Sequence, residues 1–103
     1  MDRDQLIREV MENEPEYSSG AELACVSFDY AACRFIFVEQ EDGKRHEVDL
    51  PALRRGLDVL ESSVNEGRLH LPFDGPLGDP CSWDAECVDA LVQCATFGEV
   101  VFG

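Results

Sequence analysis

Residues 34–50 read RFIFVEQEDGKRHEVDL, and this stretch decides the fold that the sequence predicts. Asp42-Gly43 is a favoured pair for a two-residue type I′ hairpin turn, because Asp and Gly tolerate the positive φ that both central positions need. The turn would fix the register of two antiparallel strands. The expected cross-strand pairs are Glu41 with Lys44, Glu39 with His46, Phe37 with Val48, and Phe35 with Leu50. One face of the hairpin is then apolar at the end away from the turn.

A further strand is expected immediately before this hairpin. Its alternating apolar positions are Ala24, Val26, Phe28 and Tyr30, separated by smaller or polar residues. A turn closed at Ala31-Ala32 places Phe28 opposite Phe35. The same register places Val26 opposite Phe37. The aromatic side chains of both strands are therefore expected on one face of the sheet.

Helical spacing of apolar residues predicts a first helix over residues 2–13 and a second helix after Asp49. The first should stop before Glu14-Pro15, because a proline restricts the residue that precedes it. The second has Asp49 as its N-cap, Pro51 just inside and Gly67 as a stop. The inward positions are Leu6, Ile7, Val10 and Met11 in the first helix, and Leu53, Leu57, Leu60 and Val64 in the second.

Residues 68–80 contain three prolines and several further turn formers, which predicts an irregular surface loop. Ser82 is then the expected N-cap of a third helix that ends at Gly98. Residues 99–102 have the composition of a short C-terminal strand. The inward positions of the third helix are Val88, Leu91, Val92 and Ala95, and its outward positions are Glu86, Asp89 and Gln93.

The order αβββαα predicts the α+β class, with a three-stranded antiparallel meander and helices packed on one face of the sheet. The length of 103 residues suits one compact domain over residues 1–103. The first residues carry charges and lack the apolar run of a signal peptide, and no stretch is long enough to span a membrane. Five cysteines without an export signal favour reduced thiols, and so we expect a cytoplasmic protein.

Acidic residues dominate the charge of the chain. It has 22 Asp and Glu against 8 Lys and Arg, a formal net charge of -14. Residues 69–103 contain no Lys or Arg, and their acids are Asp74, Asp79, Asp84, Glu86, Asp89 and Glu99. Direct binding to nucleic acid is disfavoured, because phosphate contacts depend on Lys and Arg. A strongly anionic surface suits a cationic protein partner instead.

The leading hypothesis is a small acidic protein-binding module, an inhibitor or adaptor that presents a negative face to a basic partner such as a nucleic-acid-binding protein. In size and charge the chain resembles DNA-mimic proteins of the kind found among anti-restriction and anti-CRISPR proteins. No cofactor or metal is expected, and the oligomeric state is left open. The predicted partner-binding residues are Asp74, Asp79, Trp83, Asp84, Glu86 and Asp89, with Trp83 as an aromatic anchor.

Two alternatives are retained. In the first, the chain is a housekeeping domain whose acidity reflects a salt-adapted or GC-rich host. In the second, it is a small thiol enzyme that uses Cys81 near a helix N-terminus, with His70 eleven residues earlier. The acids around Cys81 argue against this enzyme, since nearby negative charge disfavours a thiolate. Glu39 opposite His46 is interpreted as a structural surface pair rather than as an acid–base pair.

Overall fold

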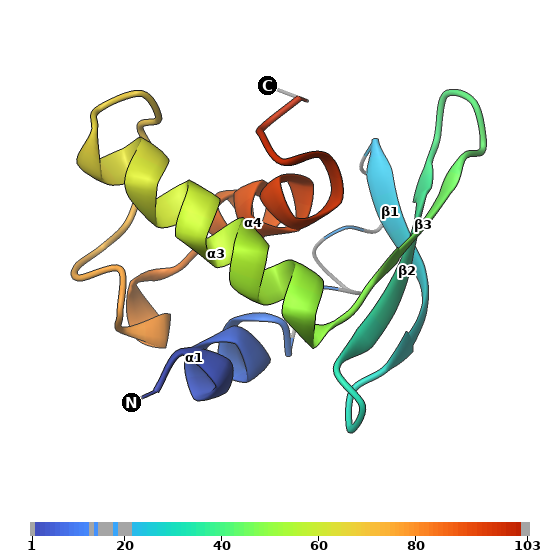
Figure 1. Cartoon of the computed structure of the whole chain (residues 1–103), viewed down its shortest axis with the longest axis horizontal. Helices are drawn as coiled ribbons and strands as arrows, with labels where there is room; N and C mark the ends of the chain where they lie inside the picture. The colour runs from blue at the N-terminus through green and yellow to red at the C-terminus, as the bar shows by residue number, and fades with distance from the viewer. Residues whose placement is uncertain (1, 13, 15–17, 19–21, 102–103) are drawn as a thin grey trace.

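The computed structural model describes residues 2–12, 14, 18 and 22–101 of the chain. Helices α1, α3 and α4 gather on one side of the molecule and a three-stranded sheet on the other (Figure 1). The predicted α+β class and the order of its elements are confirmed. The elements are α1 (Arg3–Val10), β1 (Leu23–Asp29), β2 (Arg34–Glu39), β3 (Arg45–Val48), α3 (Leu50–Asn65), the 3₁₀-helix η1 (Pro80–Ser82) and α4 (Ala85–Phe97).

The sheet is an antiparallel meander in the order β1-β2-β3, as predicted. The predicted register between β2 and β3 is wrong, because Phe35 pairs with Val48 and Phe37 pairs with His46. The loop has four residues rather than two, and the Glu39 amide donates to the carbonyl of Lys44 at 2.9 Å beyond it. Each residue therefore meets a partner two positions away from the expected one. A shift of two keeps every side chain on its predicted face.

The reason for the longer loop lies in Asp42 and Gly43. A type I′ turn needs positive φ at both residues, but only Gly43 of the pair has it, at 74°. The Asp42 carboxylate instead accepts a hydrogen bond from the Lys44 amide at 2.9 Å. Such an Asx turn offers the backbone an alternative to the tight hairpin.

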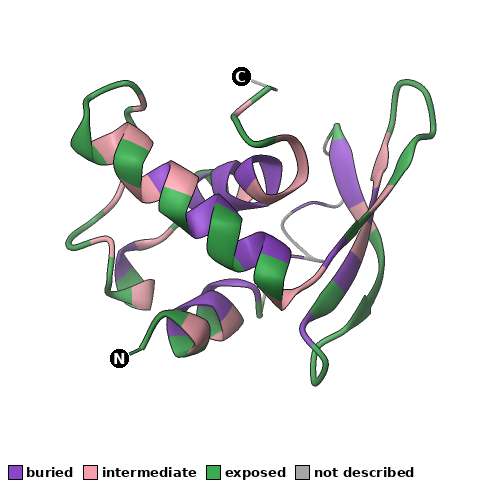
Figure 2. Cartoon of the chain, viewed as in Figure 1, coloured by how far each residue is buried: buried purple, intermediate pink, exposed green. Residues whose placement is uncertain are grey.

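The pairing of β1 with β2 agrees with the prediction only near the turn. Phe28 pairs with Phe35 as expected, but a bulge at Val26 shifts the register, so that Cys25 rather than Val26 faces Phe37. Phe28 is 57% exposed although its partner Phe35 is 1% exposed. Phe28 therefore has the predicted partner but lies outside the core. The helices bury the start of this edge strand and leave its second half open (Figure 2).

The inner faces of the helices and of the sheet meet in a hydrophobic core (Figure 2). The predicted helix stops are confirmed, because Gly67 and Gly98 follow α3 and α4 with positive φ of 74° and 78°. The predicted N-cap Asp49 accepts from the Ala52 amide at 3.0 Å. Core side chains with almost no exposure include Ile7, Leu23, Phe35, Phe37, Leu53, Leu57, Leu60 and Leu91.

Three predictions about the last third of the chain need correction. Asp84, not Ser82, is the N-cap of α4, because Ser82 is buried in η1 and the chain is extended at Trp83. Gln93, expected to face outward, is 1% exposed. Residues 99–101 form no strand, and the rest of the predicted C-terminal strand lies outside the described residues. No helix in the described ranges is both long enough and apolar enough to cross a bilayer.

Candidate functional site

The acidic loop, which we define as residues 74–84, closes upon itself. The Asp74 amide donates to the carbonyl of Ser82 at 2.9 Å, which joins the two ends of the loop. Inside it, the Asp79 carboxylate accepts from the Cys81 amide at 3.0 Å and caps η1. These bonds give a proline-rich segment a defined shape. The carboxylates that it carries are therefore held by a folded loop.

Trp83 anchors this loop to the body of the protein. Its indole Nε1 donates to the carbonyl of Leu77 at 2.7 Å, and its ring meets Phe73 edge-on with centroids 5.2 Å apart. Both aromatic residues are half-buried. A Trp that already has a hydrogen-bond partner and an aromatic neighbour supports the loop. This arrangement favours a structural role for Trp83 over its predicted role as an exposed anchor.

The predicted acidic residues differ in how they are held. Asp74, Asp79, Asp84 and Glu86 are exposed, whereas Asp89 is half-buried. The Asp84 carboxylate accepts from the Cys87 amide at 3.0 Å as the cap of α4. The prediction that Asp89 faces solvent is therefore wrong. A charge reversal at Asp84 would change the surface charge and remove the cap of α4 at the same time.

Four arginines form ion pairs with acids in other parts of the molecule. Ion pairs join Arg3 to Asp58 and Glu61, Arg54 to Asp4, Arg34 to Glu47, and Arg68 to Glu66. Within the part of the chain that the structure describes, no acid of residues 69–101 has an ion-pair partner. The negative charge of this region is therefore not compensated locally.

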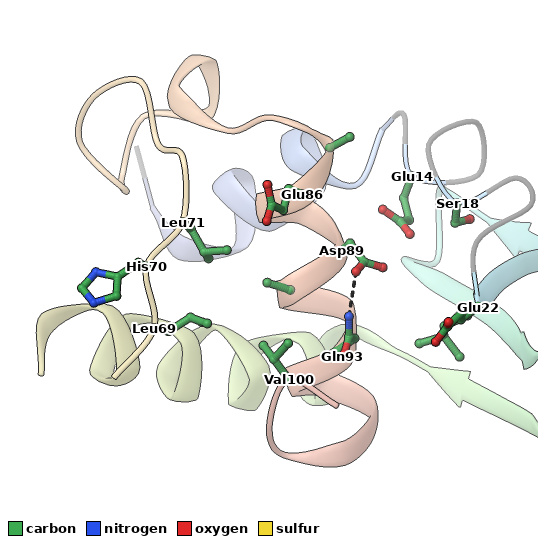
Figure 3. A pocket seen from close by; sticks show the side chains of 13 residues that line it. Glu14, Ser18, Glu22, Leu69, His70, Leu71, Glu86, Asp89, Gln93 and Val100 are labelled. Atoms are coloured by element: carbon green, nitrogen blue, oxygen red, sulfur yellow. Dashed lines mark hydrogen bonds between the residues drawn. The ribbon is translucent and has the colours of Figure 1, made fainter. Parts of the chain in front are cut away.

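A pocket of about 500 Å³ opens beside the N-terminal half of α4. Figure 3 shows Glu14, Glu22 and Asp89 toward one end of this pocket and Leu69 and Leu71 toward the other, with Glu86 and Val100 between them. Of the predicted site residues, the structure brings Glu86 and Asp89 to this pocket. The remaining predicted residues, Asp74, Asp79, Trp83 and Asp84, do not line it. The pocket also contains acids that the sequence analysis did not single out, namely Glu14 and Glu22.

Glu14 is the most unusual of these residues. Its side chain is 1% exposed, and neither carboxylate oxygen has a hydrogen-bond partner within the part of the chain that the structure describes. Burial, with a smaller contribution from the charge of Asp89, raises the pKa of Glu14 from 4.5 to about 8. Burial also raises the pKa of Asp89, although a hydrogen bond from Gln93 Nε2 at 2.7 Å opposes that shift. The site can therefore hold a proton or a cation.

Sequence analysis did not identify Glu14 because it placed this residue after the end of the first helix. One signal was present in the spacing. Glu14 continues the stripe of buried apolar residues that includes Ile7 and Met11, at positions three and seven residues further along the chain. An acid that continues a buried stripe is a candidate for a functional group, since ionisable side chains are seldom buried without a partner.

The thiols give little support to the enzyme alternative. Cys81 is exposed, and in the described ranges no hydrogen bond joins it to His70, whose ring lies at the far side of the pocket from Glu14 (Figure 3). Cys87 and Cys94 are buried in the core, and burial raises the pKa of each thiol to about 11. The described residues contain no group of three or more side chains suited to a metal ion.

The predicted contact between Glu39 and His46 is present despite the changed register. Glu39 Oε2 lies 2.7 Å from His46 Nε2, and the imidazole also meets Phe97 edge-on. The contact is diagonal across β2 and β3, and both side chains are largely shielded from solvent. Such a pair supports the packing of α4 against the sheet.

Comparison with protein families, curated proteins and solved structures finds no match to this chain.

Proposed function

We propose that this protein is a small protein-binding module that presents its acidic loop and the first turns of α4 to a basic partner. It would act as an inhibitor or adaptor, and its charge suits a partner that normally binds nucleic acid. The observation that carries the proposal is that residues 69–101 contain no Lys or Arg and that, in the described chain, none of their acids has an ion-pair partner. Uncompensated charge of one sign attracts a partner of the other sign.

The rigidity of the acidic loop supports the same proposal. The hydrogen bond between Asp74 and Ser82 and the cap at Asp79 hold the backbone in place. Carboxylates at fixed positions lose less conformational entropy on binding than those of a disordered acidic tail. A basic groove that binds nucleic acid would release counterions when it closes on such a surface. The complex should therefore weaken steeply as salt is added.

The test compares two double charge reversals in affinity capture from a native lysate. D74K/E86K changes exposed acids of the proposed surface that have no capping role. E9K/E41K is the matched control, because it changes two exposed acids elsewhere and alters the net charge equally. We expect a basic protein to be captured at low salt and to be lost with D74K/E86K only. Neutral or acidic partners, a salt-indifferent complex, or equal loss with both variants would contradict the proposal.

A further inference from the structure

We infer that the pocket containing Glu14 and Asp89 receives a guanidinium group on an apolar stem, that is, an arginine side chain of the partner. This inference rests on the proposed function and names the group that the module recognises. The inference concerns one pocket beside α4, whereas the proposed function concerns the exposed carboxylates of the acidic loop and the first turns of α4. The two ideas can therefore fail independently.

The burial and missing hydrogen bonds of the Glu14 carboxylate give the first reason to expect a ligand in this pocket. This side chain is 1% exposed, and among the described residues neither oxygen has a hydrogen-bond partner. A buried polar group without a partner is destabilising, and a charged one more so. Figure 3 shows this carboxylate directed into the pocket. A ligand that donates hydrogen bonds there would remove the penalty.

The second argument is the presence of Asp89 at the same end of the pocket (Figure 3). The charge of Asp89 acts on Glu14, and Asp89 Oδ2 is oriented by the hydrogen bond from Gln93 at 2.7 Å. Among the described residues, the other charged or titratable groups that line the pocket are Glu22, Glu86 and His70, of which His70 lies on the side away from Glu14. The charge of Glu14 also acts on the Cys25 thiol. No lysine or arginine among the described residues lines the pocket. Its chemistry therefore selects a cation.

The shape of the pocket indicates which cation fits. Leu69, Leu71 and Val100 offer apolar surface away from Glu14 and Asp89, as the methylene stem of a long basic side chain requires. A guanidinium donates through a planar fork that suits a carboxylate. An ammonium is a more strongly hydrated point charge and gains less from such a fork. A metal ion would need more ligating side chains than the described residues bring together.

The protonation of Glu14 should make the binding of a guanidinium depend on pH. Because the pKa of Glu14 is raised to about 8, the empty site holds a proton at neutral pH. A guanidinium must displace that proton, so its affinity should increase as the pH rises from about 7 to about 9.

The experiment titrates the whole protein with Nα-acetyl-arginine N-methylamide by calorimetry and NMR. The corresponding citrulline derivative is a neutral control of the same shape, and the lysine derivative tests the guanidinium assignment. We expect the arginine probe to bind best and to shift resonances of Asp89 and Leu71. E14Q should weaken it at least about tenfold, as expected for the loss of a charge-assisted hydrogen bond. E41Q, which changes an exposed loop acid that does not line this pocket, should retain both the affinity and its pH dependence.

Several outcomes would overturn the inference. These are equal binding of the arginine and citrulline probes, binding of the lysine probe as tight as that of arginine, or an affinity unchanged in E14Q. Thermal unfolding of each variant verifies that it is folded, so that a loss of binding reports on the site. If the probe fails while D74K/E86K still abolishes partner capture, the subsite is wrong and the proposed function stands. If the probe binds but no basic partner is captured, the pocket is a guanidinium site and the proposed function is wrong.

Discussion

Gly56 of α3 lies against Ala95 of α4 so closely that a Cβ at Gly56 would stand 2.6 Å from the backbone nitrogen of Ala95. Contacts under 3.0 Å are not tolerated by real Cβ atoms, and a backbone atom cannot rotate away as a side chain can. The absence of a side chain at Gly56 therefore lets the two helices approach. This close packing fixes α4, and with it Asp89 and the adjoining pocket.

We predict that Gly56→Ala destabilises the fold. Alanine favours a helix over glycine by about 1 kcal/mol, but overpacking a tight contact costs roughly 1–3 kcal/mol. Because the clash is with backbone, we expect the cost to exceed the gain. Urea denaturation measures the difference. Ser62→Ala, at an exposed position of the same helix, is the control and should be nearly neutral. Unchanged or increased stability of Gly56→Ala would show that the helices can separate without cost.

A second prediction concerns the start of α4. Asp84→Ala should lower the free energy of unfolding by about 0.5–2 kcal/mol, because the Cys87 amide loses its capping carboxylate. Asp84→Asn should retain most of the stability, since asparagine is an equally good N-cap. Denaturation of the two variants separates the cap from the charge. Similar losses in both would indicate that charge, rather than capping, explains the effect.

A third prediction concerns thiol reactivity. Cys81 is exposed, whereas burial raises the pKa of Cys87 and Cys94 to about 11. Alkylation of the native protein at neutral pH should therefore modify Cys81 before either buried thiol, because the thiolate is the reactive species. Mass spectrometry of digested samples gives the order. We expect the rate at Cys81 to match that of a free thiol, and acceleration well beyond that rate would revive the thiol-enzyme alternative.

The sequence predicts the elements of this fold better than it predicts their contacts. Asp49, Gly67 and Gly98 act within a few residues, so the ends of α3 and α4 could be identified from local patterns. The register of the β2–β3 hairpin could not, because Asp42 can serve either a type I′ turn or an Asx turn. Composition does not reveal which of the two the surrounding structure selects.

The candidate site was predictable only in part. The acids of residues 74–89 stand out in the sequence because no lysine or arginine accompanies them. Glu14 shares its pocket with residues of α4 and with Leu69–Leu71, which are distant in the chain, so local patterns do not reveal its surroundings. Asp84 and Ser82 are equally good caps by residue type, and only the buried position of Ser82 in η1 decides between them.

The last prediction is a pH dependence of stability that originates in Glu14. Its pKa is about 8 in the folded protein and near 4.5 when the chain is unfolded, so the folded state binds the extra proton between these values. Stability should therefore fall as the pH rises from about 4.5 to about 8, and this contribution should then level off. The full effect is on the order of 3–5 kcal/mol. The raised pKa of Asp89 acts in the same direction.

Glu14→Gln isolates this contribution, because the amide keeps the shape of the side chain and cannot ionise. We expect the variant to lose most of the decline in stability with pH and to be more stable than the parent protein near pH 8, since it buries no charge there. Chemical denaturation across the pH range measures both effects. Glu41→Gln, at an exposed loop position, should reproduce the parent profile. A Glu14→Gln profile that follows the parent at every pH would mean that the carboxylate is hydrated in solution, and the pocket would then lose its most distinctive group.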